Sequence, residues 1–259
     1  MNYLILSKIL FQENMQKEIY KKILKSKAEG KKLFSLLIDP DKFGSPEVLQ
    51  KAEAASVDFI MVGGSLLSDG NFENCIQEIK KNTLIPVIIF PGNHLQISKT
   101  ADAILLLSLI SGRNAELLIG KHVIAAPLLK ASDLEILSTG YMLIESGNQT
   151  TASYMSNSSP IPFEKDDIAV CTALAGEQLG LKIIYMDAGS GAKNPVNGSM
   201  IKKVSSSISI PLIIGGGINN PGKALLACES GADMIVVGNA IETDLSLIAS
   251  ITKAIHSFN

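Results

Sequence analysis

Glycine and small polar residues follow three consecutive apolar segments in the second half of the chain. They are Gly189-Ser190-Gly191, Gly215-Gly216-Gly217 and Gly238-Asn239. Glycine lets the backbone approach an anion closely and turn its N–H groups towards it, and Ser190 and Asn239 could donate from their side chains. The loops after the last two strands of a (β/α)₈ barrel are a frequent phosphate site in that fold. The spacing therefore predicts a phosphate-binding site made by these three loops.

A carboxylate, Asp39, ends an early apolar segment, where burial is costly unless the group is paired or bound to a metal. Mg²⁺ prefers one or two carboxylates, with water and substrate phosphates as its other ligands. Asp39 and Ser65, which follows the next apolar segment, would make such an open Mg²⁺ site. The alternative is a structural pair between Asp39 and Lys42, or a turn cap, although Asp41 is better placed as the turn residue.

A second carboxylate, Asp187, directly precedes the predicted phosphate loops. It could accept hydrogen bonds from substrate hydroxyl groups or act as a general base. Glu145 follows another apolar segment and could do either, and His94 could face the same site, so the roles of these two residues stay open. The sequence has no Ser-His-Asp order of known type and no nucleophile elbow, which argues against serine-hydrolase chemistry.

Eight short segments rich in Val, Ile and Leu would position these residues. Continuous apolar runs of this length are typical of strands buried on both faces of a parallel sheet. The segments are Leu33–Ile38, Phe59–Val62, Val87–Phe90, Ala103–Leu107, Tyr141–Ile144, Ile183–Met186, Leu212–Ile214 and Met234–Val237. The clearest helical patterns between them are Glu47–Ala55, Phe72–Lys81, Asp166–Leu179, Asn197–Ser205, Gly222–Ser230 and Leu245–Ile255. This alternation predicts an α/β fold, a (β/α)₈ TIM barrel, with an open doubly wound sheet as the alternative.

Three segments depart from this alternation. Pro91–Thr100 has weak helical character, so the third helix is expected to be reduced to a loop. Glu145–Pro162 is long and polar, as binding loops and lids often are, although it could equally be plain surface loop. Met15–Glu29 would be an extra helix, within an N-terminal extension of residues 1–32, that could close the bottom of the barrel. Residues 1–259 are otherwise expected to form a single barrel domain.

The composition excludes several classes of partner. The 23 basic and 25 acidic residues give a net charge of −2 with no concentrated basic face, and Trp is absent, which argues against nucleic acid. No apolar run reaches the roughly 18 residues needed to span a bilayer, and no signal peptide is evident, so a cytoplasmic protein is expected. Cys75, Cys171 and Cys228 lack disulfide or metal spacing and are expected to be buried thiols. A mean hydropathy of +0.27 indicates a large buried sheet, an apolar cleft or an oligomer interface.

Several motifs, in this order and spacing, resemble those of geranylgeranylglyceryl phosphate synthases and their bacterial relatives. The motifs are LLIDPDK at 36–42, GGS at 63–65, FPGN at 90–93, YMDAGSGA at 185–192, GGGI at 215–218 and GADMIVVGN at 231–239. The segment at 151–191 resembles especially the larger class, which has archaeal and bacterial members. Single pieces such as GGGI occur in many phosphate-binding barrels, whereas the combination is highly specific.

The resemblance implies a Mg²⁺-dependent prenyltransferase of ether-lipid synthesis. It would join a polyprenyl diphosphate to the 3-hydroxyl group of sn-glycerol 1-phosphate and release diphosphate. Asp39 and Ser65 would hold Mg²⁺, and Asp187, where the family usually has Glu, would hold the glycerol hydroxyl groups and take the proton. The acceptor would be bound by Tyr185, Met186, Asp187, Ala188, Gly189, Ser190, Gly191, Gly215, Gly216, Gly217, Gly238 and Asn239.

The prenyl tail of such a donor needs a long apolar groove. The residues that could supply it are Ile88, Phe90, Ile104, Leu106, Leu107, Leu109 and Ile110, although these could equally be ordinary barrel core. Arg113 could meet the diphosphate or lie on the surface. The rival functions are another phosphate-binding barrel enzyme, such as an isomerase or aldolase, and a barrel that binds glycerol phosphate or lipid without catalysis. The sequence leaves the prenyl chain length open and favours a homo-oligomer.

Overall fold

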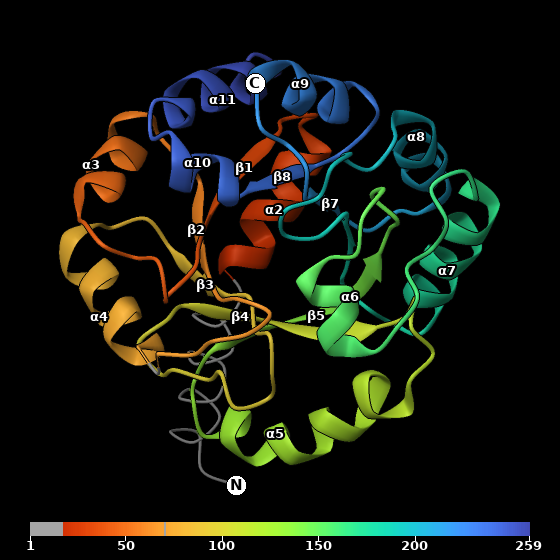
Figure 1. The fold of residues 1–259 in the computed structure, drawn as a ribbon, viewed down its shortest axis with the longest axis horizontal. Helices are drawn as coiled ribbons and strands as arrows, with labels where there is room; N and C mark the ends of the chain where they lie inside the picture. The colour runs from red at the N-terminus through yellow and green to blue at the C-terminus, as the bar shows by residue number, and fades with distance from the viewer. Residues whose placement is uncertain (1–17, 70) are drawn as a thin grey trace, which may run out of the picture.

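The structure, a computed structural model, describes residues 18–69 and 71–259. Eight parallel strands close into a barrel in chain order, with β8 paired to β1 (Figure 1). The strands are β1 (Leu33–Ile38), β2 (Phe59–Val62), β3 (Val87–Ile89), β4 (Ala103–Leu109), β5 (Glu135–Leu143), β6 (Ile183–Asp187), β7 (Leu212–Gly215) and β8 (Met234–Val237). The predicted barrel is confirmed, because the sheet is closed rather than open.

Most of the helices lie around the barrel and cover its outer face (Figure 1). They are α3 (Glu47–Ala54), α4 (Phe72–Asn82), α5 (Lys121–Lys130), α7 (Asp166–Gln178), α8 (Gly198–Ser207), α9 (Pro221–Glu229) and α11 (Leu247–His256). The short helix α10 (Asn239–Thr243) follows β8 and lies inside this ring. The six predicted helices are found, each with bounds within two residues of the expected ones. A π-helical turn, η1 (Glu116–Gly120), leads directly into α5, which the sequence pattern did not resolve.

No helix lies between β3 and β4, so the predicted reduction of the third helix to a loop is confirmed for this described segment. Pro91 and Gly92 follow β3, and the side chain of Gln96 accepts a hydrogen bond from the Gly92 N–H at 2.8 Å. These side-chain contacts shape the loop where helical bonds would otherwise form. No helix from this loop therefore covers the outer face of β4, and the described helical element that contacts β4 most is η1.

The strand residues divide between two hydrophobic layers. One layer fills the barrel interior and the other lies between the barrel and the helices. Because side chains of a strand alternate between its two faces, Tyr185 of β6 belongs to the interior layer while Ile184 and Met186 belong to the outer one. The same alternation points Asp187, two residues after Tyr185, to the interior at the carboxyl end of β6.

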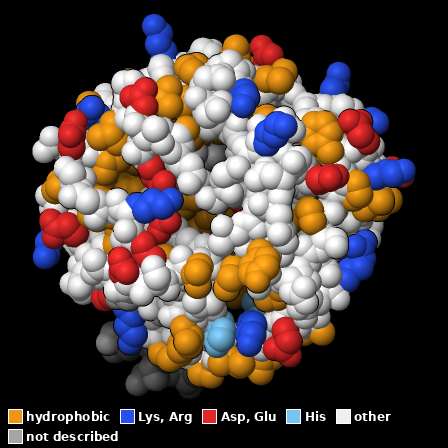
Figure 2. Space-filling model, viewed as in Figure 1, with side chains coloured by type: hydrophobic (Ala, Val, Ile, Leu, Met, Phe, Trp, Pro, Cys, Tyr) orange, Lys and Arg blue, Asp and Glu red, His pale blue; other side chains and the backbone are white. Residues whose placement is uncertain are grey.

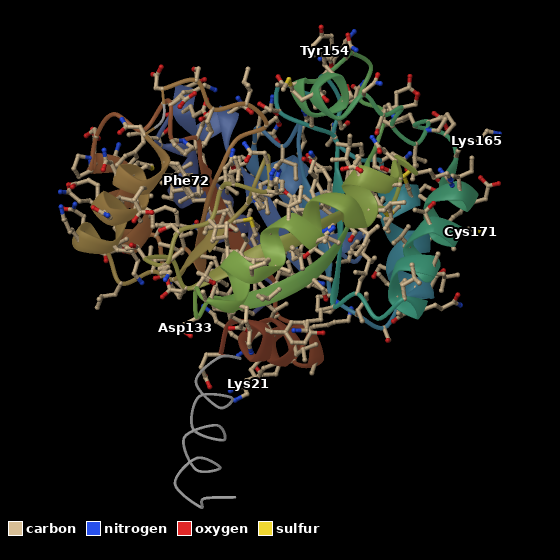
Figure 3. The ribbon with its side chains drawn as sticks, turned by 90° about the horizontal axis from the view of Figure 1, so that it is seen from below. Lys21, Phe72, Asp133, Tyr154, Lys165 and Cys171 are labelled. Carbon is tan, nitrogen blue, oxygen red and sulfur yellow. The ribbon has the colours of Figure 1, made fainter. Side chains whose placement is uncertain are left out.

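Helix α2 (Glu18–Ala28) closes the amino end of the barrel. Its Ile19 and Ile23 are buried in the interior layer, and the buried Glu135 carboxylate accepts hydrogen bonds from the Ile19 and Tyr20 N–H groups, each at 2.9 Å. Figure 3 shows α2 at the end of the barrel opposite Tyr154. The predicted helix Met15–Glu29 is thus found for residues 18–28, while residues 15–17 lie outside the described ones. With one end closed, a site of any depth must open at the carboxyl ends of the strands.

The three cysteines do not share one environment. Cys75 and Cys228 are buried, and burial raises the pKa of each thiol to about 12. The expectation that all three are buried is wrong for Cys171, which is exposed. Cys171 lies on the solvent side of α7, whose Ala169 and Ala173 pack against the barrel.

Among the described helices, none is long and apolar enough to cross a bilayer.

Candidate active site

A cavity of about 780 Å³ opens at the carboxyl ends of the strands. Figure 2 shows this face of the molecule, which is hollowed near its middle. The strand-end loops of β6, β7 and β8 supply mostly glycine and polar lining residues, whereas β4 and α5 supply mostly apolar ones. The cavity therefore has a polar part and an apolar part that meet over the barrel centre.

Asp187 lies at this meeting point, with both carboxylate oxygens hydrogen-bonded. Its Oδ2 accepts from the Tyr141 hydroxyl group at 2.5 Å, and its Oδ1 accepts from the Gly189 N–H at 2.7 Å. Burial raises the pKa of the Asp187 carboxyl, although these two hydrogen bonds favour its charged form. A cavity-lining carboxylate with a raised pKa is suited to accept a proton from a bound hydroxyl group.

Tyr141 was not among the predicted site residues. It lies on β5 directly opposite Tyr185 of β6, and in the sequence it resembles any other strand residue. Burial, and then the nearby Asp187 charge, raises the pKa of the Tyr141 hydroxyl well above its ordinary value. Tyr141 therefore stays protonated at neutral pH and donates to Asp187. A pairing of strands that are distant in sequence was needed to reveal this contact.

Three aromatic rings form one wall of the cavity beside Asp187. The ring centroids of Phe90 and Tyr185 are 5.1 Å apart in a stacked arrangement, and the Tyr141 ring packs edge-on against both. All three residues line the cavity. The negative faces of aromatic rings attract cations, so this wall could stabilise positive charge developing on a bound apolar group.

The predicted phosphate loops converge on the polar part of the cavity. Gly189 has a φ of 92° and Gly216 a φ of 81°, in the left-handed region where only glycine is comfortable. Among the described residues, the N–H groups of Ser190, Gly191, Gly216 and Gly217 donate to no other group. The loop residues that line the cavity are Gly189, Ser190, Gly191, Gly216, Gly217, Gly238 and Asn239. Several unused donors around one concave surface make an anion-binding site.

Other predicted acceptor residues lie elsewhere. Met186 and Ala188 are buried in the outer hydrophobic layer, because they alternate with Tyr185 and Asp187. Gly215 lies against the Tyr185 hydroxyl group and does not line the cavity, so it makes room for that ring. The structure thus brings Tyr185 and Asp187 to the site but not Met186, Ala188 or Gly215.

Asp39 and Ser65 both line the cavity, at the ends of β1 and β2, which are paired. The loops that carry them are joined by Asp41, whose carboxylate accepts hydrogen bonds from Ser68 and Asp69. The local turn contact is made by Asp39 rather than by the predicted Asp41, because Asp39 Oδ1 accepts a hydrogen bond from the Asp41 N–H at 3.1 Å. The Lys42 ammonium lies 3.6 Å from Asp39 Oδ2, so the predicted structural pair is also present.

A divalent metal would find few protein ligands in this region. The described residues contain no group of three His, Cys, Asp or Glu side chains placed to hold a metal ion. One carboxylate, Asp39, and one hydroxyl group, Ser65, fit an open Mg²⁺ site only if water and substrate oxygens complete the coordination. The donor set fits the type of site that phosphate-bearing substrates complete.

Lys42 makes its shorter contact elsewhere. Its Nζ donates to Glu242 Oε2 of α10 at 2.8 Å, and this hydrogen bond is the main reason that the pKa of Lys42 is raised. Ser190 and Asn239, predicted as donors to an anion, also contact each other, because the Ser190 hydroxyl group donates to Asn239 Oδ1 at 2.8 Å. Glu242 was not predicted as a site residue, because the predicted residues directly follow strands and Glu242 lies one helical turn beyond Asn239.

The apolar part of the cavity reaches both faces of β4. Leu105, Leu107 and Leu109 belong to the interior layer, whereas Ile104 and Leu106 face α5 outside the barrel. Further apolar lining comes from Phe90, Ile97, Leu117, Ala125 and Leu129. Two other predicted groove residues lie in the core: Ile88 is buried in the interior layer, and Ile110 packs in the outer one. The cavity can extend past β4 because no helix between β3 and β4 covers it.

Two histidines line the cavity. The sequence analysis indicated His94 alone, and the other is His122 of α5. The His122 Nε2 atom donates to the Leu107 carbonyl at 2.9 Å, which fixes α5 to the end of β4. Its buried Nδ1 atom has no partner among the described residues.

Glu145 and Arg113 do not line the cavity. Both are exposed: the Glu145 carboxylate accepts from the Phe163 N–H, and the Arg113 guanidinium donates to the Ser111 carbonyl. The long loop that begins with Glu145 contains a short helix, α6 (Thr151–Ser156), four of whose residues line the cavity. A capping box between Thr150 and Ser153 stabilises this helix.

Comparison with known proteins gives one consistent result. The chain matches the PcrB family over residues 22–255. It is 52% identical over 246 residues to the geranylgeranylglyceryl phosphate synthase of Chitinophaga pinensis, covering 94% of this chain and 98% of that protein. It is 42% identical to the enzyme of the same name from Pyrococcus horikoshii, covering 87% of this chain and 90% of that protein.

Solved structures agree with these sequence matches. The crystal structure of (S)-3-O-geranylgeranylglyceryl phosphate synthase from Thermoplasma acidophilum, in complex with its substrate sn-glycerol-1-phosphate, is similar with a TM-score of 0.86 and 33% identity. The similarity covers 92% of this chain and 98% of that one. A thiamine phosphate pyrophosphorylase from Pyrococcus furiosus, with a TM-score of 0.56 and 14% identity, shares the fold alone.

We predict that Gly216→Ala weakens the binding of inorganic phosphate by about tenfold or more, because loss of hydrogen bonds to a charged group has that effect. A Cβ at this position would come within 2.7 Å of Asp187 Oδ1 and 2.5 Å of the Gly189 nitrogen. Titration calorimetry measures the affinity. The matched control is Gly180→Ala, which has nearly the same φ of 84° but nothing within 4 Å of the added Cβ. Equal losses in both variants would contradict the assignment of the phosphate site.

Proposed function

The chain belongs to the PcrB family, and on that premise we propose that it joins a polyprenyl diphosphate to the 3-hydroxyl group of sn-glycerol 1-phosphate with release of diphosphate. It is a transferase of ether-lipid synthesis with a TIM-barrel fold. The observation that carries the proposal is the position of Asp187, a hydrogen-bonded carboxylate between an anion site and an apolar cavity. An isomerase or aldolase acting on a small phosphorylated substrate would not need the apolar part of the cavity. A barrel that only binds its ligand would not need the raised pKa of Asp187.

The acceptor occupies the polar part of the cavity in this proposal. The glycine loops of β6, β7 and β8 would hold the phosphate group with their N–H donors. The glycerol carbons would then extend towards Tyr185 and Asp187, which line the cavity on the barrel side. This orientation directs the 3-hydroxyl group, at the other end of the acceptor, to Asp187.

The chemical step is a substitution at the first carbon of the prenyl chain. The bond between this carbon and the diphosphate oxygen breaks, and a bond to the glycerol 3-oxygen forms. The hydroxyl proton passes to Asp187, whose raised pKa favours this transfer. Positive charge develops on the allylic carbon, and the rings of Phe90, Tyr141 and Tyr185 would face it.

We propose Asp39 and Ser65 as the residues that hold Mg²⁺. The metal would neutralise charge on the diphosphate as it leaves, which is the chemistry that a divalent cation supplies in such transfers. Support comes from the donor set, one carboxylate and one hydroxyl group on neighbouring strands, and from Asp41, which ties their two loops together. Asp39 keeps its loop in place by accepting a hydrogen bond from the Asp41 N–H at 3.1 Å.

The prenyl tail would lie in the apolar part of the cavity, between β4 and α5. Leu106 and Ile104 on the outer face of β4, with Ala125 and Leu129 on α5, offer continuous apolar surface away from the barrel centre. Each buried methylene group of the tail contributes about 0.8 kcal/mol to binding. A donor with a long tail would therefore bind mainly through this apolar part of the cavity.

We also propose that the protein acts in the cytoplasm as a homo-oligomer, with residues 1–259 as one domain. Large apolar side chains are exposed along η1 and α5, with exposed fractions of 61% for Ile119, 65% for Val123, 54% for Ile124 and 52% for Leu128. Ile119 and Val123 are one helical turn apart, and so are Ile124 and Leu128. A patch of this kind is typical of an interaction surface. Figure 2 shows hydrophobic side chains at the rim over α5.

We predict a particle mass in solution at least twice the 27.6 kDa of the chain, as measured by light scattering. Val123→Asp would reduce that mass, because a buried charge at an interface is costly. Leu84→Asp, which changes an apolar residue that is 95% exposed in the loop before β3, is the control and would leave the mass unchanged. A wild-type mass of one chain would contradict this part of the proposal.

We predict that the wild-type protein forms an ether and releases one diphosphate per turnover when given geranylgeranyl diphosphate, sn-glycerol 1-phosphate and Mg²⁺. Omission of any one of the three would stop the reaction. Asp39→Asn would lower kcat/KM by about 100-fold or more, since metal neutralisation of a leaving group contributes several kcal/mol. Product is measured by extraction of labelled lipid. Full activity of Asp39→Asn, or of the wild type without metal, would reject the Mg²⁺ assignment.

We predict that Tyr141→Phe moves the acid limb of the pH profile of kcat/KM to higher pH. The variant removes a hydrogen bond that favours the charged Asp187 carboxylate, so the pKa of that group rises further. Because Asp187 must be deprotonated to act as a base, activity is then lost at a higher pH. Tyr185→Phe is the control, since the Tyr185 hydroxyl group donates no hydrogen bond to Asp187. An unchanged acid limb in Tyr141→Phe would show that another group sets it.

A further inference from the structure

Polar side chains from three loops form a continuous series of contacts across the cavity mouth. The Ser190 hydroxyl group donates to Asn239 Oδ1 at 2.8 Å, and Asn239 Nδ2 lies 3.5 Å from Glu242 Oε2. Lys42 Nζ donates to the same Glu242 oxygen at 2.8 Å and lies 3.6 Å from Asp39 Oδ2. The series therefore runs from the acceptor phosphate site to the proposed metal site, and its centre is Glu242.

The charges in the cavity make Lys42 the lysine best placed for a second substrate anion. Among the described lining residues the lysines are Lys42 and Lys121, and the carboxylates are Asp39, Asp187 and Glu242. Lys121 lies on α5 with its ammonium 4.0 Å from Glu116, whereas Lys42 lies beside Asp39. A diphosphate bound to a metal at Asp39 would therefore meet the Lys42 ammonium first.

The position of Lys42 depends on Glu242. The ammonium has two carboxylates within reach, and it is closer to Glu242, at 2.8 Å, than to Asp39, at 3.6 Å. Without Glu242, the ammonium would be drawn to Asp39 and would occupy oxygens that a metal needs. Glu242 thus keeps Lys42 over the cavity and leaves Asp39 available.

We propose that Glu242 is a positioning residue that holds Lys42 for the diphosphate of the prenyl donor and Asn239 for the phosphate of the acceptor. The inference rests on the proposed function, because it assigns one anion to each side of Glu242. The fold explains how one carboxylate serves both. Glu242 follows Asn239 by three residues on α10, and Lys42 follows β1, which pairs with β8 where the barrel closes.

Three variants separate the two roles. Lys42→Met removes the cation, Asn239→Ala removes the amide, and Glu242→Gln removes the charge that holds both. The control is Glu47→Gln, which breaks a comparable pair with Lys51 at 3.0 Å outside the cavity. Titration calorimetry gives the affinity for sn-glycerol 1-phosphate alone and for inorganic diphosphate with Mg²⁺, and steady-state kinetics gives KM for each substrate.

We predict that Lys42→Met weakens diphosphate binding by about tenfold and leaves acceptor binding within about twofold, with the reverse in Asn239→Ala. Glu242→Gln would weaken both, by about threefold to tenfold each, with KM raised for both substrates. Glu47→Gln would change neither. If Glu242→Gln unfolds, as circular dichroism would show, Glu242→Asp tests the same point, because the shorter carboxylate withdraws from both partners.

Two outcomes overturn the inference. Wild-type affinity of Glu242→Gln for either anion would show that Glu242 does not position both partners. A fall in kcat or melting temperature with both affinities and both KM values unchanged would show a merely structural role. Failure of the proposed function is distinguishable from either, since the wild type would then form no ether although the binding measurements still separate the variants.

Discussion

The rest of the site depends on one carboxylate, Asp187, that is buried and forms no ion pair with the residues that the structure describes. Burial of a charge in a protein interior is costly, and here two hydrogen bonds, from the Tyr141 hydroxyl group and the Gly189 N–H, reduce that cost without removing it. Both donors require particular neighbours: Tyr141 must lie on β5 in register with β6, and Gly189 must take a positive φ. The hydrogen bonds that stabilise the Asp187 carboxylate thus depend on both the β5–β6 pairing and the first glycine loop.

The same barrel presents a polar and an apolar surface to one cavity, according to what covers each part of it. The loops after β6, β7 and β8 contain glycines and expose backbone donors to an anion. No helix lies between β3 and β4, so β4 presents apolar side chains on both faces to one cavity. His122 fixes α5 to β4 through the Leu107 carbonyl and so defines the far wall. A site for an anion and a site for a long apolar chain can therefore meet at Asp187.

Much of this could be predicted from the sequence, because buried parallel strands give continuous apolar runs and strand ends converge at one face. The bounds of β1, β2 and β8 and the glycine loops follow directly from that pattern. Met186 and Ala188 were included with their motif, and only the alternation of β6 shows that they face outward. Tyr141, His122 and Glu242 could not be found, since their importance comes from partners 46, 15 and 200 residues away.

The short side chain of Asp187 also places the proposed general base beside the proposed phosphate site. Its Oδ1 lies 2.7 Å from the point where a Cβ of residue 216 would be, so the carboxylate and the second glycine loop occupy adjoining space. A Glu at 187 would extend the carboxylate by roughly 1.5 Å, one more carbon–carbon bond, and would move its oxygens away from the Gly189 N–H. Tyr141, Gly189 and Gly216 together therefore fit an aspartate. The aspartate carboxylate reaches all three neighbours, and it keeps the proposed base adjacent to the loop proposed to hold the phosphate.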